Sequence, residues 1–187
     1  MKIRKICFGA LIGLLVLSVA VLTFCNYRLR QSEEHLARCA EYCVGRFDTL
    51  MADLPGYLDN YLETGDKASC VRILETVKQV REAYTQLEFY TDNGQPIDRG
   101  IEFGLRGIVA TFDAFYAADE DPPQREEYAY RVKAYLETMR EVWEEHRKDY
   151  VEAQDERWDV RQSICRALRE ELEESLAESH ESMWLGL

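Results

Sequence analysis

The sequence predicts an all-α protein: an N-terminal transmembrane helix, then an antiparallel bundle of about four helices with a long C-terminal helix. Three observations predict this fold class. Residues 6–25 form an apolar run without a charge. Beyond them, apolar residues recur at alternating steps of three and four, which is the helical pattern. Only four prolines and ten glycines occur in 187 residues, whereas a turn-rich β fold needs more.

The apolar run reads ICFGALIGLLVLSVAVLTFC. Its length matches the ~20 residues that a helix needs to cross the hydrocarbon core. A secretory signal has a shorter apolar region of ~7–15 residues before a small-x-small cleavage site. Ser18-Val19-Ala20 could serve as such a site, but cleavage there would leave the apolar sequence VLTFC at the new N-terminus. We therefore expect the segment to be retained as a signal anchor.

Basic residues flank the apolar run unequally. Lys2, Arg4 and Lys5 precede it, while Arg28 and Arg30 follow it and are soon joined by acidic residues. The positive-inside rule then favours a cytoplasmic N-terminus and places the rest of the chain outside the cytoplasm. The expected organisation is a cytoplasmic N-terminus (1–5), a transmembrane helix (6–25), an extracytoplasmic helical bundle (26–150) and an acidic C-terminal helix or tail (151–187).

Acidic residues dominate the region after the anchor. Residues 26–187 hold 20 basic and 35 acidic side chains, a formal charge of −15. Such a surface repels nucleic acid, whose binding depends on lysine and arginine neutralising phosphates. The length suits one domain with its own core. We therefore expect no nucleic-acid partner and a single acidic helical domain.

Four apolar stripes predict the helices of the bundle, and turn signals separate them. The stripes lie at 36–54, 70–87, 101–115 and 132–150, and the turn signals are Pro55-Gly56, Thr64-Gly65-Asp66, Asp92-Asn93-Gly94 and the acidic run 119–123. Gly65 is expected to end a helix, and Asp66 and Asp98 to cap the next ones. A 3-4 repeat is also typical of an extended coiled coil, but the turn signals favour a chain that folds back.

The C-terminal region begins with a stretch of low apolar density, 151–159. The helical stripe then resumes at Ile164, Leu168, Leu172 and Leu176. This pattern leaves two possibilities open, a continuation of the fourth helix or a separate tail helix.

Three glycines, Gly100, Gly104 and Gly107, fall on one face of the third predicted helix. Each costs a helix interior ~1 kcal/mol relative to alanine, so a compensating reason is expected. Close packing against a neighbouring helix is one reason, and a ligand pocket or hinge is the other. Aromatic side chains could fill the space beside the glycines or line such a pocket: Tyr84, Phe89, Tyr90, Phe112, Phe115, Tyr116, Tyr128, Tyr130, Tyr135, Trp143, Tyr150 and Trp158.

Two further glycines, Gly9 and Gly13, form a small-x-x-x-small pattern within the membrane segment. This pattern lets two membrane helices approach closely, so we expect weak homodimerisation carried by the span. The alternative is that these glycines are simply common membrane-helix residues.

His35, Cys39 and Cys43 lie at steps of four on one helix face. Two neighbours of this set could hold zinc if another helix supplied the remaining ligands. Burial in the core is favoured, since cysteine is among the most buried residue types. With Cys70 and Cys165, the cysteines could instead form disulfides outside the cytoplasm; we expect reduced core residues and no metal or other cofactor.

Catalytic patterns are missing from the sequence. Glu144-Glu145 beside His146, and Glu170-Glu171, could suggest acid/base or metal chemistry, but adjacent acids on a helix usually form a solvated face. Zinc-binding His-Glu-x-x-His, phosphate-binding glycine loops and nucleophile elbows are absent. We therefore expect no catalytic residues and a protein that is not an enzyme.

A distant family resemblance accompanies these features. The order of anchor, glycine-containing helix (Gly104 or Gly107), acidic proline turn before Glu126-Glu127-Tyr128, and a long helix leading to Arg157-Trp158 resembles the N-terminal part of the YpeB-type spore germination proteins, over residues 1 to about 165. The resemblance implies outside helices and a role beside a cortex-lytic enzyme. That family continues into C-terminal domains for which this sequence has no counterpart, and no functional residue is carried over.

Together these patterns favour an extracytoplasmic domain that works by contact with a protein partner, as a scaffold, accessory protein or sensor ectodomain. A small-molecule or metal-binding sensor module is the alternative.

Overall fold

The structure is a computed structural model that describes residues 2–91, 100–118 and 124–184, with side chains from residue 13 onward except at 88 and 91. Within these residues it contains five α-helices, one 3-10 turn and no strand. The prediction of an all-α protein is therefore confirmed. The chain divides into two compact units, Met1–Arg38 and Cys39–Leu187, which are described one at a time.

The first unit is the N-terminal part of helix α1 (Lys2–Thr64). It makes α1 long and apolar enough to cross a membrane, and none of its most apolar window is buried. The two hydroxyls of the span donate to the helix's own carbonyls, Ser18 Oγ to Leu14 O at 2.9 Å and Thr23 Oγ1 to Val19 O at 2.8 Å. Both hydroxyls thus have a partner within the helix, as a bilayer requires.

In the second unit, α1 continues past Pro55 to Thr64. The prediction that Pro55-Gly56 ends this helix is wrong. Proline in a helix interior costs ~3 kcal/mol, but the packing face continues beyond it because Leu58 and Tyr61 are buried. Burial of one large apolar side chain contributes roughly 1.5–3 kcal/mol, so tertiary packing offsets the local preference of proline.

The first reversal of the chain comes at Gly65 instead. Gly65 has φ of 63°, a left-handed conformation that glycine adopts without strain. Asp66 then caps helix α2 (Lys67–Thr91), because its Oδ1 accepts from Ser69 N at 2.8 Å. Hydrogen bonds from the backbone and hydroxyl of Ser69 lower the pKa of Asp66 to about 2. The predicted end at Gly65 and cap at Asp66 are confirmed.

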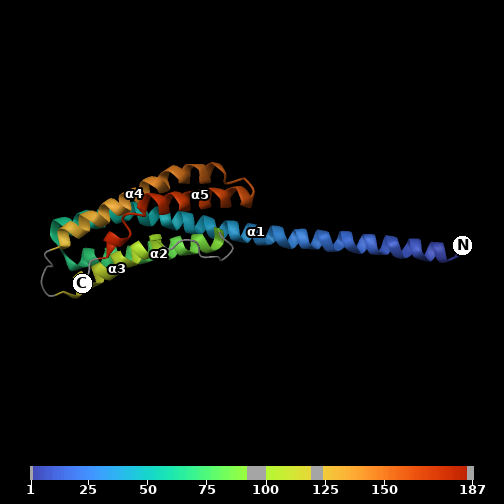
Figure 1. Ribbon diagram of the computed structural model, residues 1–187, viewed down its shortest axis with the longest axis horizontal. Coiled ribbons are helices and arrows are strands. Elements are labelled where there is room, and N and C mark those ends of the chain that lie inside the picture. Colours follow the sequence, from blue (N-terminus) through green and yellow to red (C-terminus); the bar gives the residue numbers. More distant parts are fainter. Residues whose placement is uncertain (1, 92–99, 119–123, 185–187) are drawn as a thin grey trace. The chain divides into compact units, whose positions relative to one another are not determined.

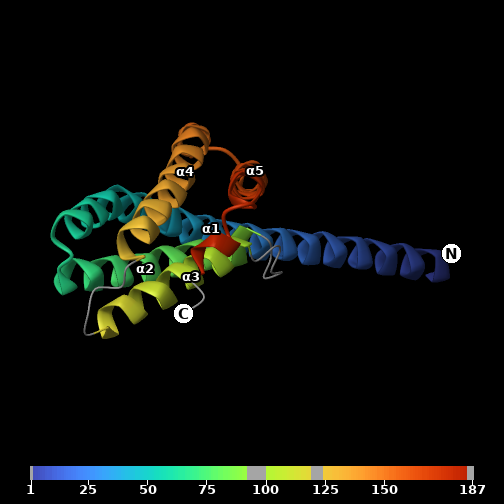
Figure 2. The same cartoon turned by 60° about the vertical axis from the view of Figure 1, so that its left-hand side comes forward.

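Three more helices follow: α3 (Gly100–Ala117), α4 (Arg125–Glu152) and α5 (Trp158–Leu176), and a 3-10 turn, η1 (Glu181–Met183), comes last. Helix α2 packs along α3, and α4 along α5 (Figure 1). Turned by 60°, the view shows η1 lying against α3 (Figure 2). Of the two possibilities for the C-terminal region, α5 is a separate helix, since the chain leaves α4 after Glu152 and resumes helix at Trp158.

The core of the second unit is aromatic at both ends. Phe112 of α3 lies between Tyr61 and Tyr128, with ring centroids 5.4 and 5.9 Å away. The ring centroids of Phe47 and Trp143 lie 4.3 Å apart. The other predicted turns, 92–94 and 119–123, and the predicted cap Asp98 lie outside the described residues.

Candidate functional site

The glycine face of α3 is closely packed against other parts of the second unit. It is formed by Gly100, Gly104 and Gly107. A Cβ at Gly104 would lie 2.5 Å from Tyr135 Oη, and one at Gly107 would lie 2.7 Å from the carbonyl oxygen of Met183. A Cβ at Gly100 would meet Glu173 and His180. The face is therefore filled by α4, α5 and the segment after α5.

That segment, Ala177–Trp184, is named the strap. Its backbone is held by side chains of other helices: Tyr128 Oη donates to Met183 O at 2.7 Å, within the core. Trp184 Nε1 donates to the carbonyl oxygen of Phe103 on α3 at 3.3 Å, and the two rings lie 5.2 Å apart. Because the glycines lack side chains, the strap's backbone can approach α3 closely, which supplies the compensating reason expected for three glycines in one helix.

A largely buried polar cluster joins the strap to α4 and α5. The ring of His180 lies between Tyr135 of α4, with Oη 3.1 Å from Nδ1, and Glu173 of α5, with Oε2 3.4 Å from Nε2. His180 is only 7% exposed. Burial, and next the charge of Glu173, raise the pKa of Tyr135, so its hydroxyl stays protonated and can donate to Nδ1. The other ring nitrogen, Nε2, lies near the Glu173 carboxylate but has no hydrogen-bond partner among the described residues.

Glu173 also completes the start of α3. Its Oε1 accepts from the backbone N–H of Ile101 at 3.2 Å and from Tyr84 Oη at 3.4 Å. The first N–H groups of a helix have no partner within the helix, and a carboxylate is favoured there by the helix dipole. One side chain of α5 thus supplies a hydrogen bond to α3, a second to α2 and a charge beside His180.

Chemically, a tyrosine, a histidine and a carboxylate in a row could relay a proton. Here all three are packed inside the protein, and the glycine face that would have to admit a substrate is covered by the strap. In this arrangement Tyr135 and Glu173 link His180 of the strap to α4 and α5.

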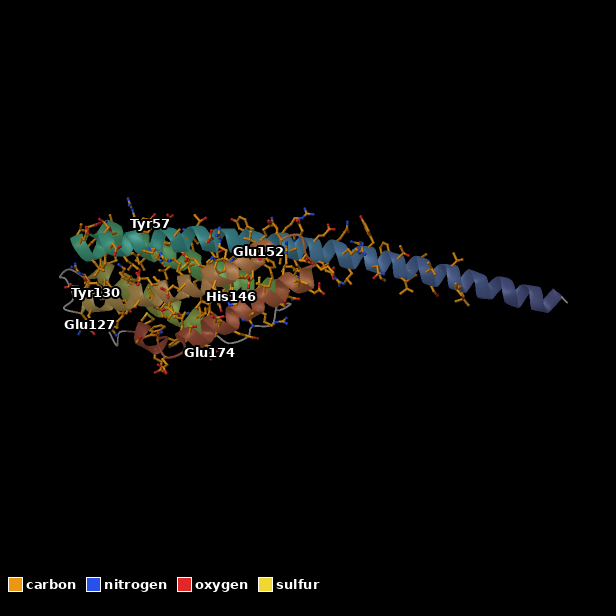
Figure 3. The ribbon with its side chains drawn as sticks, turned by 90° about the horizontal axis from the view of Figure 1, so that it is seen from above. Tyr57, Glu127, Tyr130, His146, Glu152 and Glu174 are labelled. Carbon is orange, nitrogen blue, oxygen red and sulfur yellow. The ribbon has the colours of Figure 1, made fainter. Side chains whose placement is uncertain are left out.

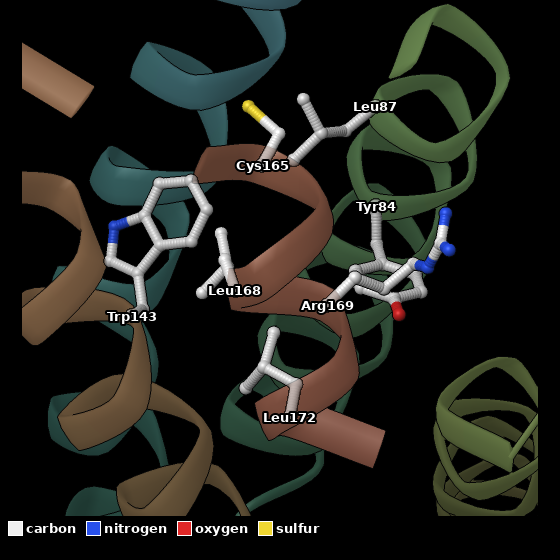
Figure 4. A pocket seen from close by; sticks show the side chains of 7 residues that line it. All are labelled: Tyr84, Leu87, Trp143, Cys165, Leu168, Arg169 and Leu172. Atoms are coloured by element: carbon white, nitrogen blue, oxygen red, sulfur yellow. The ribbon is translucent and has the colours of Figure 1, made fainter. Parts of the chain in front are cut away.

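Two pockets lie along α5. The one in Figure 4 is lined by Tyr84, Leu87, Trp143, Cys165, Leu168, Arg169 and Leu172. The other is lined by Val44, Trp143, His146, Arg147, Tyr150, Ile164, Cys165 and Leu168. In each, the space open to the centre of a water molecule is about 10 Å³. That volume holds about one water, so neither is a preformed site for a small molecule.

The predicted cysteine positions are core positions, as expected for Cys43 and Cys70. Both are buried, as is Cys165, and the thiol of Cys70 donates to Phe112 O at 3.3 Å. Burial raises the pKa of Cys43 and Cys70 to about 11 and that of Cys165 to about 12. These thiols are therefore poor nucleophiles and poor metal ligands at neutral pH.

Of the residues considered for acid/base chemistry, His146 and Glu171 contact each other. His146 Nε2 of α4 lies 2.6 Å from Glu171 Oε2 of α5, and Figure 3 labels His146 on α4. Among the described residues, no three histidine, cysteine or acidic side chains are placed to hold a metal ion. The pair links α4 to α5.

The two membrane glycines are placed less fully. Gly13 lies in α1, and a Cβ added there would meet nothing within 4 Å. The surroundings of Gly9 lie outside the described residues, and the homodimer stays a prediction.

Sequence reasoning missed the Tyr135–His180–Glu173 cluster. A signal for part of it was present, because Glu173 and His180 are seven residues apart, two helical turns on one face of the C-terminal stripe. Nothing in the sequence paired that face with the glycines of α3.

Comparison with known proteins identifies no relative: no family model, no curated protein and no solved structure matches the chain.

Proposed function

We propose that the chain is a single-pass membrane protein whose helical domain is an antiparallel bundle that works outside the cytoplasm by contact with a protein partner. It would serve as a scaffold, accessory protein or sensor ectodomain and would not be an enzyme. The observation that carries this proposal is the filled glycine face of α3. Where an enzyme or small-molecule sensor needs an accessible cavity, this domain packs its glycines, tyrosines and buried histidine against its own strap.

The membrane part of the proposal rests on the first unit, which is long and apolar enough to span a bilayer. The orientation rests on the basic residues before the span. The acidic surface suits contact with a protein and disfavours nucleic acid.

Thiol labelling of intact cells tests the topology. Tyr130 is 55% exposed and its side chain lies on the surface of α4 (Figure 3). In a Cys7→Ser, Cys25→Ser, Cys39→Ser background, Tyr130→Cys should react with a membrane-impermeant maleimide before the cells are opened, because its side chain is exposed whereas the remaining native thiols are buried. Lys5→Cys is the reciprocal control and should react only after permeabilisation. The opposite pattern would place the helical domain in the cytoplasm and overturn the proposal.

A photo-crosslinking amino acid at Tyr130 tests the contact. A discrete adduct of one mass in living cells, lost when the domain is unfolded by mutation, is expected of a protein with a specific partner. Only a ladder of unrelated adducts, equal for folded and unfolded variants, would contradict a contact function.

A small-molecule or metal-binding sensor remains the alternative. The pocket lined by Tyr84 and Arg169 supports this alternative, because its lining is apolar around one cation. A small molecule would fit there only if these side chains moved apart. A further alternative is an accessory role in spore germination, which rests on the resemblance to YpeB-type proteins alone.

A further inference from the structure

The strap keeps a helix-like backbone although it turns away from the axis of α5. Ala177 has φ −51° and ψ −45°, and His180 has φ −58° and ψ −44°, both in the right-handed helical region. Ser179 N donates to Leu176 O at 2.9 Å, and Met183 N to His180 O at 3.3 Å. These are bonds between residues three apart, the 3-10 pattern that is frequent in the last turn of an α-helix.

The local sequence favours a straight helix through this bend. From Trp158 to Trp184 there is no glycine and no proline, the residues that break helices. The buried stripe of α5 also continues in helical register, from Leu172 and Leu176 to His180 and Met183, each of which is buried. The sequence alone would therefore extend α5 to about Met183.

Tertiary contacts hold the bend. Tyr135 bonds the ring of His180, Tyr128 donates to Met183 O, and Trp184 donates to Phe103 O. All three bonds join the strap to α3 or α4, through its backbone or its side chains. If these three bonds were lost, no hydrogen bond would hold the strap away from a straight continuation of α5.

We propose that the strap is a two-state latch. In the docked state it covers the glycine face of α3. In the released state it continues α5 as a straight α-helix to about Met183 and uncovers Gly107, while Glu173 of α5 and Tyr135 of α4 still lie beside Gly100 and Gly104. The element is bistable because local helix preference and tertiary contacts favour different backbone paths for the same residues.

Fluorine NMR of the full chain in detergent micelles tests release. With 5-fluorotryptophan at all three tryptophans, and the Trp184 signal assigned with Trp184→Phe, Trp143 and Trp158 serve as internal reporters of the core. Gly107→Leu places a side chain where Met183 O and Trp184 now lie. Trp184 is already 37% exposed, so release should shift its signal further, to that of a fully solvated indole, and leave the Trp143 and Trp158 signals in place.

The matched control is Gly45→Leu, on a helix surface with nothing within 4 Å, which should leave all three signals in place. A milder variant, Tyr128→Phe, removes the bond to Met183 O and should raise the released fraction by about 2- to 12-fold, the range for one hydrogen bond. If Gly107→Leu does not fold, Tyr128→Phe tests the proposal in its place.

The backbone of the released strap is read with ¹³C-labelled alanine and methionine. The Cα shifts of Ala177 and Met183 should stay helical in the released form. Random-coil shifts would overturn the proposal, since the strap would then be a loose tail. A Trp184 signal that moves only together with those of Trp143 and Trp158 would overturn it as well, since the strap would then be an inseparable part of the core.

Discussion

Replacing Gly104 with alanine should destabilise the protein, although the same replacement normally stabilises a helix. Alanine gains ~1 kcal/mol over glycine in a helix interior. At Gly104 the new methyl group would lie 2.5 Å from Tyr135 Oη, 3.0 Å from Tyr135 Cζ and 3.1 Å from His180 Nδ1. Tyr135 is buried, so the clash displaces the ring or the helix.

The magnitude follows from three contributions. Overpacking costs ~1–3 kcal/mol, and loss of the Tyr135–His180 bond costs about 0.5–1.5 kcal/mol. After the helix gain is subtracted, the net loss is about 2 kcal/mol, which lowers Tm by roughly 4–8 °C for a chain of this size.

Thermal unfolding of the full chain in micelles, followed by circular dichroism, provides the measurement. Gly45→Ala is the matched control: its methyl group meets nothing within 4 Å, so it should raise Tm by roughly 2–4 °C. If Gly104→Ala raised Tm as Gly45→Ala does, the close packing of the glycine face would be refuted.

Three further predictions follow from the same structure. At pH 8, Cys70 and Cys165 should react with a maleimide at least ~100-fold more slowly in the folded protein than in urea, because their pKa values of about 11 and 12 leave little thiolate; equal rates would contradict their burial. Asp66→Asn should lower Tm at pH 7. The difference in Tm from wild type should shrink as pH falls from 3.8 toward about 2, because the lowered pKa stabilises the fold only while the carboxylate is charged. A difference in Tm that is constant with pH would argue against the cap. In membranes, oxidative crosslinking through Cys25 should detect a weak dimer that Gly13→Ile abolishes, and an unchanged crosslinked fraction would show that the membrane glycines are only permissive.

The sequence predicted the class of fold and most helix positions, because both depend on the apolar period. The stripes at 70–87, 101–115 and 132–150 fall within α2, α3 and α4. The cap at Asp66 was also predictable, since an aspartate after a glycine has a local reason to start a helix.

The prediction at Pro55 was wrong because tertiary packing outweighed the local preference of the backbone. A turn signal is a statement about local preference, whereas Leu58 and Tyr61 are buried by helices far away in the sequence. Only the continuation of the apolar steps from Leu54 to Leu58 and Tyr61 could have indicated that the helix goes on.

The sequence predicted the glycine face of the candidate site but not the strap that covers it. The three glycines of α3 violate helix preference and were singled out for that reason. What fills the space beside them could not be predicted, because the strap is separated from α3 by two helices and its own sequence reads as ordinary helix.

These two departures from local preference meet at one place. Helix α3 carries residues that disfavour helix, while the strap carries residues that favour helix and is bent. Each departure costs free energy by itself, and each is explained by the other: the glycines admit the strap's backbone, and the docked backbone requires the bend. In natural proteins such conflicts between local and global preference concentrate where function constrains the fold. The contact between the strap and α3 is therefore the part of this molecule where substitutions should separate stability from function, whereas substitutions in the Phe47–Trp143 core should change stability alone.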